Sequence, residues 1–177
     1  CKQLVAWHGS LAKHRSSHRA TVLFSNPASR SVVAPDAPPR TIIGVPNHPI
    51  PIAGELSRYI FDVDPAVLAA HLTGVLAAEH NLSALGQEPT YLTGPTPITD
   101  AALDCFEVRE ILPFRTRDLS QALRARNVGQ LEIKKRGVDI TPETFRRDLK
   151  LRGPNAATLL LTKIAGHPTA ILANRIP

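Results

Sequence analysis

The feature that most constrains the fold is a repeated change of hydrophobic period that begins at Cys105 and continues to the C-terminus. Alternation at a period of two is typical of half-buried strands, whereas apolar residues every three or four positions indicate amphipathic helices. The pattern predicts strands at 105–112, 129–136, 157–164 and 169–173 and helices at 117–126 and 142–152. The order β-α-β-α-β-β predicts a compact two-layer α/β unit in which helices cover one face of a sheet.

The first half of the chain has a weaker pattern. Residues 2–7 and 19–24 each predict a short strand, and a polar loop would join them in a hairpin-like pair. Residues 25–54 contain seven prolines, which remove backbone donors and fix φ, so this segment is predicted to be a linker interrupted by one β-branched run.

A second, smaller α/β region is predicted from residue 55 to residue 104. A strand around Tyr59 to Phe61 precedes Asp64-Pro65, which is a typical helix start with an N-cap and a proline in the first turn. Apolar residues at three- and four-residue spacing predict that this helix covers residues 65–80 and packs on a sheet. The fold class is therefore α/β (α+β), with two small two-layer units.

The net charge of +6 is confined to the C-terminal part of the chain. Residues 105–177 contain 14 Lys and Arg against seven Asp and Glu, whereas residues 1–104 contain seven against eight. Such asymmetry is typical of a surface that binds nucleic acid or another polyanion, and a generally solvated basic face remains the alternative. No apolar run reaches the roughly 18 residues that a membrane helix needs.

The search for catalytic and metal-binding motifs is negative, so no catalytic, cofactor-binding or metal-ligating residue is predicted. The sequence has no glycine-rich phosphate loop, no metalloprotease helix motif and no nucleophile elbow. The spacing of His8, His14 and His18 does not match a metal-ligand pattern, and Asn47-His48-Pro49 is interpreted as a loop. Cys105 is interpreted as a small core residue, and two cysteines without a pairing motif favour a reducing, cytoplasmic compartment.

The candidate binding residues are cations that follow one another along a strand tip, a turn and a helix. Arginine donates bidentately to phosphate and lysine acts as a point charge, so neither reads base sequence by itself. Few aromatic residues accompany these cations, which favours contacts with the backbone and shape of a nucleic acid over base stacking. The predicted set is Lys134, Lys135, Arg136, Arg146, Arg147, Lys150 and Arg152.

The C-terminal sequence resembles the THUMP-like domain found at the C-terminus of bacterial class I S-adenosylmethionine-dependent methyltransferase-like proteins. The segments that carry the resemblance are 128–139, Thr141-Pro142-Glu143, 149–153 and 156–159. On this resemblance, the expected domains are a remnant of the methyltransferase core at 1–24, the linker at 25–54, a small ferredoxin-like region at 55–104 and the THUMP-like domain at 105–177. The absence of methionine indicates a fragment.

The resemblance implies an accessory module that binds RNA, such as tRNA or rRNA, and positions it for the methyltransferase domain of the same chain. S-adenosylmethionine is implied for the full-length parent, and the fragment is not expected to be catalytic alone. The other interpretation is a structural module whose basic face docks on an acidic surface of the catalytic domain or a partner subunit, without RNA binding.

Overall fold

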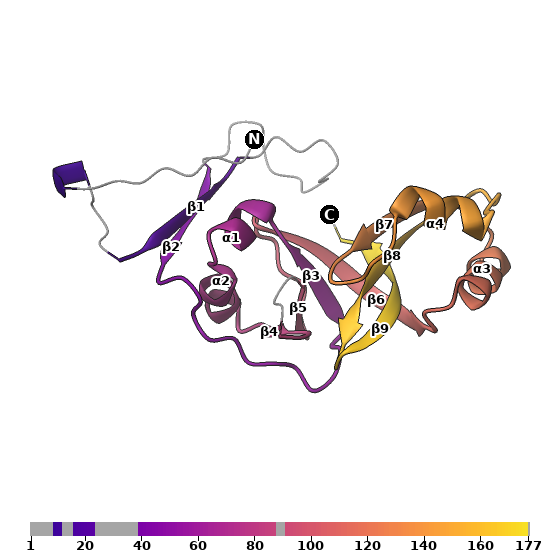
Figure 1. The fold of residues 1–177 in the computed structure, drawn as a ribbon, viewed down its shortest axis with the longest axis horizontal. Coiled ribbons are helices and arrows are strands. Elements are labelled where there is room, and N and C mark those ends of the chain that lie inside the picture. Colours follow the sequence, from indigo (N-terminus) through magenta and orange to yellow (C-terminus); the bar gives the residue numbers. More distant parts are fainter. Residues whose placement is uncertain (1–8, 12–15, 24–38, 88–90, 177) are drawn as a thin grey trace.

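The computed structural model describes residues 9–11, 16–23, 39–87 and 91–176, and the elements named below lie within these ranges (Figure 1). The first half contains a short 3-10 helix (Gly9–Leu11) and the strands β1 (His18–Val22), β2 (Arg40–Gly44), β3 (Tyr59–Val63), β4 (Ser83–Ala84) and β5 (Tyr91–Gly94). Its helices are α1 (Pro65–Ala69) and α2 (Thr73–His80). The second half contains β6 (Leu103–Leu112), α3 (Thr116–Ala125), β7 (Val128–Lys135), α4 (Pro142–Leu149), β8 (Asn155–Ile164) and β9 (His167–Arg175).

The order predicted for the C-terminal half, β-α-β-α-β-β, is confirmed. β7 and β8 are parallel and are joined through α4, whereas β9 lies between β8 and β6 and is antiparallel to both. The apolar stripes of α3 and α4 pack on this part of the sheet through residues such as Leu119, Leu123, Phe145 and Leu149, all of which are buried.

One continuous sheet joins the two halves. Its seven strands have the order β4-β5-β3-β6-β9-β8-β7, and β3 pairs with β6 so that Phe61 lies opposite Cys105. Each half is a two-layer α/β unit, as predicted, but the two units share their sheet through β6. Cys105 lies in the core, and burial raises the pKa of its thiol, which agrees with its interpretation as a core residue.

The sheet brings its two halves together on one face. Buried Ile60 and Tyr91 from the first half pack with Phe106, Leu160 and Ile171 from the second. The other face carries two separate cores, one beneath α1 and α2 and one beneath α3 and α4. In Figure 1 the strands of this sheet lie between α1 and α2 on the left and α3 and α4 on the right, and β1 and β2 lie beyond α1 and α2.

The predicted helix over 65–80 is interrupted. It begins as expected, because the Asp64 carboxylate accepts a hydrogen bond of 2.7 Å from the Ala66 amide and Pro65 occupies the first turn. The chain then leaves helical geometry at His71, whose φ is 58° and whose carbonyl accepts from the Asn47 amide at 2.9 Å. Apolar spacing continues across this break, so periodicity alone did not reveal it.

The prediction that residues 25–54 form a linker needs correction. β1 pairs antiparallel with β2, with Ala20 opposite Ile42, so a strand lies inside the segment predicted to be a linker. The predicted hairpin partner of β1, residues 2–7, lies outside the described residues, so that pairing stays a prediction. The β-branched run at residues 41–43 forms the strand because its buried Ile42 joins the first core.

No helix in the described ranges is long and apolar enough to span a membrane.

Candidate nucleic-acid interface

The structure divides the seven predicted cations into two groups. Lys134 and Arg136 are partly buried, and their side chains lie over one face of the sheet, where both form ion pairs. The remaining five are exposed, and none of them forms an ion pair within the described part of the chain. These five are Lys135, Arg146, Arg147, Lys150 and Arg152.

The inward group belongs to an inner ion cluster made of Asp62, Asp104, Glu132, Lys134, Arg136 and Arg175. The Lys134 ammonium lies 2.8 Å from carboxylate oxygens of both Asp62 and Asp104, and the Arg136 guanidinium lies 2.9 Å from Asp62. Asp62 is on β3 and Lys134 is on β7, so the cluster connects the two halves of the chain. These two cations are therefore committed to the fold.

Arg175 completes the inner ion cluster. It lies 3.0 Å from Asp104 and 2.7 Å from Glu132, and its guanidinium carbon is 4.6 Å from the centroid of the buried Phe106 ring. The Lys134 ammonium is 5.5 Å from the same ring. Cation–π contacts with the Phe106 ring therefore stabilise both cations, in addition to their ion pairs with the carboxylates.

The pKa values within the inner ion cluster are controlled by competition between burial and pairing. Burial alone would raise the pKa of Asp104, but Lys134 and Arg175 outweigh it and hold that pKa below its ordinary value. Burial would likewise lower the pKa of Lys134, and the two carboxylates outweigh it and raise that pKa. The charged forms are therefore favoured on both sides, as expected for a structural ion network rather than a proton-transfer site.

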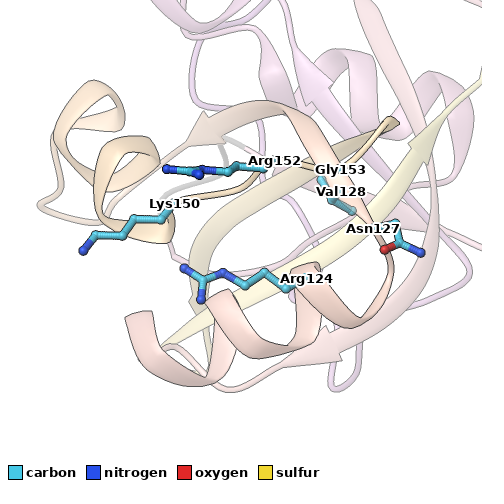
Figure 2. Close-up of a pocket in the computed structure, with 6 residues that line it drawn as sticks. All are labelled: Arg124, Asn127, Val128, Lys150, Arg152 and Gly153. Atoms are coloured by element: carbon cyan, nitrogen blue, oxygen red, sulfur yellow. The ribbon is translucent and has the colours of Figure 1, made fainter.

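Two of the five outward cations, Lys150 and Arg152, line an open pocket of about 500 Å³ between α3 and the segment that follows α4 (Figure 2). Figure 2 shows Arg124 extending from α3 toward Lys150 and Arg152, with Asn127 at the other end of the group. Val128 and Gly153 complete the lining. Three exposed cations therefore meet at one pocket, although they come from separate parts of the sequence.

A second open pocket, of about 880 Å³, shares Arg124 and Lys150 with the first. Its other lining residues are Thr116, Arg117, Ser120, Gln121, Ala125 and Asp148. We call the two pockets together the cationic groove. Its cations are Arg117, Arg124, Lys150 and Arg152, whereas Lys135, Arg146 and Arg147 line neither pocket.

The end of α4 is tied to α3 at this groove. The Ser120 hydroxyl donates to the Leu149 carbonyl at 2.8 Å, and Arg124 donates to the same oxygen at 3.0 Å. Lys150 then takes the left-handed conformation, with φ 49° and ψ 49°. Glycine is the usual residue at such a position, so a lysine there places a cation in the groove at a conformational cost.

Replacing Lys150 with glycine is expected to separate stability from binding. Glycine adopts the left-handed conformation without the steric cost, so we expect the free energy of unfolding to stay equal or rise by up to about 1 kcal/mol. Loss of the cation should at the same time weaken binding of a polyanion such as heparin. Urea denaturation and heparin-column retention measure the two effects. Earlier elution without loss of stability is the expected result, and unchanged retention would contradict it.

Another group of ligand-type side chains lies at Glu79, His80 and Asp100, whose donor atoms are all within 4.8 Å of one another. The Arg40 guanidinium lies among them, 2.6 Å from Glu79 and 3.1 Å from Asp100. His80 also bonds to Asp100, at 2.9 Å. Arg40 already neutralises these carboxylates. We therefore interpret the group as a set of ion pairs that links β2 to α2, rather than as a metal site. Of the three histidines whose spacing was compared with a metal-ligand pattern, His18 bonds to the Ala70 carbonyl, and His8 and His14 lie outside the described residues.

The sequence prediction missed Arg117 and Arg124. Both lie on α3 one heptad apart, which places them on the same side of a helix. That spacing was visible in the sequence, but their proximity to Lys150 depends on the packing of α3 against α4. The periodicity of a helix shows which residues share a face of that helix. It does not show which other helix packs against that face.

Comparison with known proteins gives one family match. Residues 103–175 match the model of the family described as THUMP domain-like. Two curated relatives, from two strains of Mycobacterium tuberculosis, are each named an uncharacterized S-adenosylmethionine-dependent methyltransferase. Each is 40% identical over 117 residues, which is 64% of this chain and 32% of the relative. The chain therefore spans about a third of their length.

A solved structure shares the fold. It is the crystal structure of a proposed methyltransferase from Porphyromonas gingivalis, with a TM-score of 0.64 and 23% sequence identity. The match covers 73% of this chain and 32% of that one.

Proposed function

We propose, from the match of residues 103–175 to the THUMP-like domain family, that the chain is the RNA-binding accessory part of a class I S-adenosylmethionine-dependent methyltransferase. In this proposal it holds an RNA substrate, such as tRNA or rRNA, for a catalytic domain in the remaining length of the protein. The names of the relatives support the methyltransferase, and the family of the domain supports RNA as the ligand.

The observation that carries the proposal is the meeting of unpaired cations at the cationic groove. Charged groups that serve the fold are expected to have carboxylate partners, as Lys134 and Arg136 do. Lys150 and Arg152 are exposed, line the same pocket and have no such partner among the described residues. Phosphate is a strong partner for such a cluster, because arginine donates to it bidentately and lysine pairs with it as a point charge.

The proposed contacts are mainly to phosphates. No Phe, Tyr or Trp ring in the described ranges is exposed, and no aromatic residue lines either pocket, so the groove offers no platform on which a base could stack. Binding through phosphates fixes the register of an RNA without reading its sequence. It should be strongly sensitive to salt, because each neutralised phosphate releases counterions.

The groove does not fit the cofactor that the relatives' names imply. S-adenosylmethionine carries a positive sulfonium centre, and Arg117, Arg124, Lys150 and Arg152 would repel it. The sequence also contains no G-x-G, so the glycine-rich cofactor motif expected of a class I methyltransferase core is absent from it. In our proposal the cofactor therefore binds outside this chain's residues, in the catalytic domain, and the chain alone transfers no methyl group.

Neutralising the groove is expected to weaken RNA binding specifically. The test variant changes Arg117, Lys150 and Arg152 to glutamine, whereas Arg124 is kept because it also caps α4. With about 0.7 counterions released per phosphate, we expect the slope of log affinity against log salt to fall by roughly two. We also expect affinity for a tRNA-sized structured RNA to fall roughly tenfold or more, as measured by fluorescence anisotropy.

A matched control removes three exposed cations elsewhere, by changing Arg19, Arg58 and Lys163 to glutamine. This variant has the same net charge, so a purely global charge effect would weaken both variants equally. Equal losses, or no loss in the groove variant, would contradict the proposal. The second result would favour the alternative in which the exposed basic face docks on a protein surface.

A further inference from the structure

The cationic groove contains one carboxylate, and the positive charge around it does not explain why it is there. Asp148 lines the larger pocket together with Arg117, Arg124 and Lys150, and its side chain is exposed. Even so, it forms no ion pair with any cation in the described ranges. A free negative charge in a groove that binds phosphates opposes that binding, because it repels the ligand.

Helix stability does not explain Asp148 either. It lies in the last turn of α4, which ends at Leu149. The helix dipole places partial negative charge at this end, so a carboxylate here is unfavourable by several tenths of a kcal/mol or more. Acidic residues that stabilise a helix belong in the first turn, where α4 has Glu143. Asp148 therefore reduces helix stability at the position where it also reduces phosphate affinity.

A carboxylate in a nucleic-acid groove has one chemical use that a cation does not have, because it accepts hydrogen bonds from the N–H groups of bases. Guanine presents two adjacent donors on its Watson–Crick edge, the N1–H and the N2 amino group, which match the two oxygens of a carboxylate. Cytosine and adenine each pair one donor with an acceptor there, and uracil has a single N–H between two carbonyl oxygens. A carboxylate fork therefore favours guanine over the other three bases.

We infer that Asp148 recognises one unpaired guanine of the bound RNA. This inference rests on the proposed function, since it needs an RNA backbone held in the same groove. Lys150 and Arg124 would bind the phosphates beside the base, and Gln121, which lines the same pocket as Asp148, offers a further amide. The groove would thus combine general affinity for phosphate with selection of one base through hydrogen bonds.

The experiment compares two hairpin RNAs that differ only in a single-stranded overhang. One overhang contains guanosines, and the other contains inosines at the same positions, which keeps N1–H and removes only the N2 amino group. The 177-residue chain is expected to bind the guanosine RNA roughly fivefold more tightly, at the lower end of the range for a specific base contact. The Asp148→Asn variant should bind both RNAs with equal affinity.

The control is Asp139→Asn, which removes one exposed carboxylate outside the groove and should keep the guanosine preference. If the wild type binds both RNAs equally, or if Asp148→Asn raises both affinities by one factor and keeps the preference, the inference is wrong while the proposed function stands. If neither RNA binds in a salt-sensitive way, the proposed function fails, and the inference fails with it.

Discussion

Replacing Asp62 with asparagine is expected to lower the free energy of unfolding by about 3 kcal/mol, because it breaks a buried ion network on one side only. Asp62 is 7% exposed, and its carboxylate is the shared partner of Lys134 and Arg136. Lys134 would keep Asp104, but Arg136 has no other carboxylate partner in the described part of the chain. The substitution therefore leaves a half-buried guanidinium without its counter-charge.

Urea denaturation followed by circular dichroism measures this loss. Asp139→Asn is the matched control, because Asp139 is exposed and outside the inner ion cluster, and it should change stability by less than about 0.5 kcal/mol. A loss below about 1 kcal/mol for Asp62→Asn would show that the inner ion cluster does not hold the two halves together. In that case Lys134 and Arg136 would again be available as ligands for RNA.

Replacing Gly153 with alanine is expected to cost about 3 kcal/mol and to deform the cationic groove. An added Cβ would lie 1.8 Å from the Asn127 carbonyl oxygen and 2.1 Å from its carbon. Both contacts are with backbone, so no side chain can rotate away to relieve them. The Gly153 amide also donates to the Val128 carbonyl at 3.2 Å, so separating the two segments would break that hydrogen bond.

Gly54→Ala provides the control, because a Cβ at Gly54 would meet nothing within 4 Å. It should leave stability unchanged or raise it by a few tenths of a kcal/mol, since alanine restricts the unfolded chain. Thermal unfolding of both variants measures the difference. If Gly153→Ala is as stable as Gly54→Ala, the close approach of the 127–129 and 153–155 segments is not what shapes the groove.

The fold of the C-terminal half was predictable because its signals are local. The strand period, the helix period and the turn residues each lie within a few positions, and they gave β6 to β9 with α3 and α4 in the correct order. The pairing of β3 with β6 was not predictable, because it depends on packing between distant segments. The sequence prediction also placed β2 in a linker. Its pairing with β1, about 20 residues earlier, again depends on a contact that no local pattern indicates.

The sequence predicted most of the cations at the candidate site. It did not predict which of them share an exposed surface. Lys134 and Lys135 are adjacent in the sequence, but strand alternation points them to opposite faces of β7. Alternation could show that Lys134 and Arg136 share a face. It could not show that this face meets Asp62, which precedes Lys134 by 72 residues. Which cations are neutralised within the chain is a property of the tertiary fold.

Lysine acetylation footprinting, with and without a structured RNA, tests the division of the cations most directly. Lys150, in the cationic groove, should react in the free protein and be protected by RNA, whereas exposed Lys163 should react equally in both samples. Lys134 should react poorly in both, because its ammonium is held by Asp62 and Asp104. An unprotected Lys150 in the presence of RNA would contradict this division of the cations, and so would a Lys134 that reacts freely in the free protein and is protected by RNA.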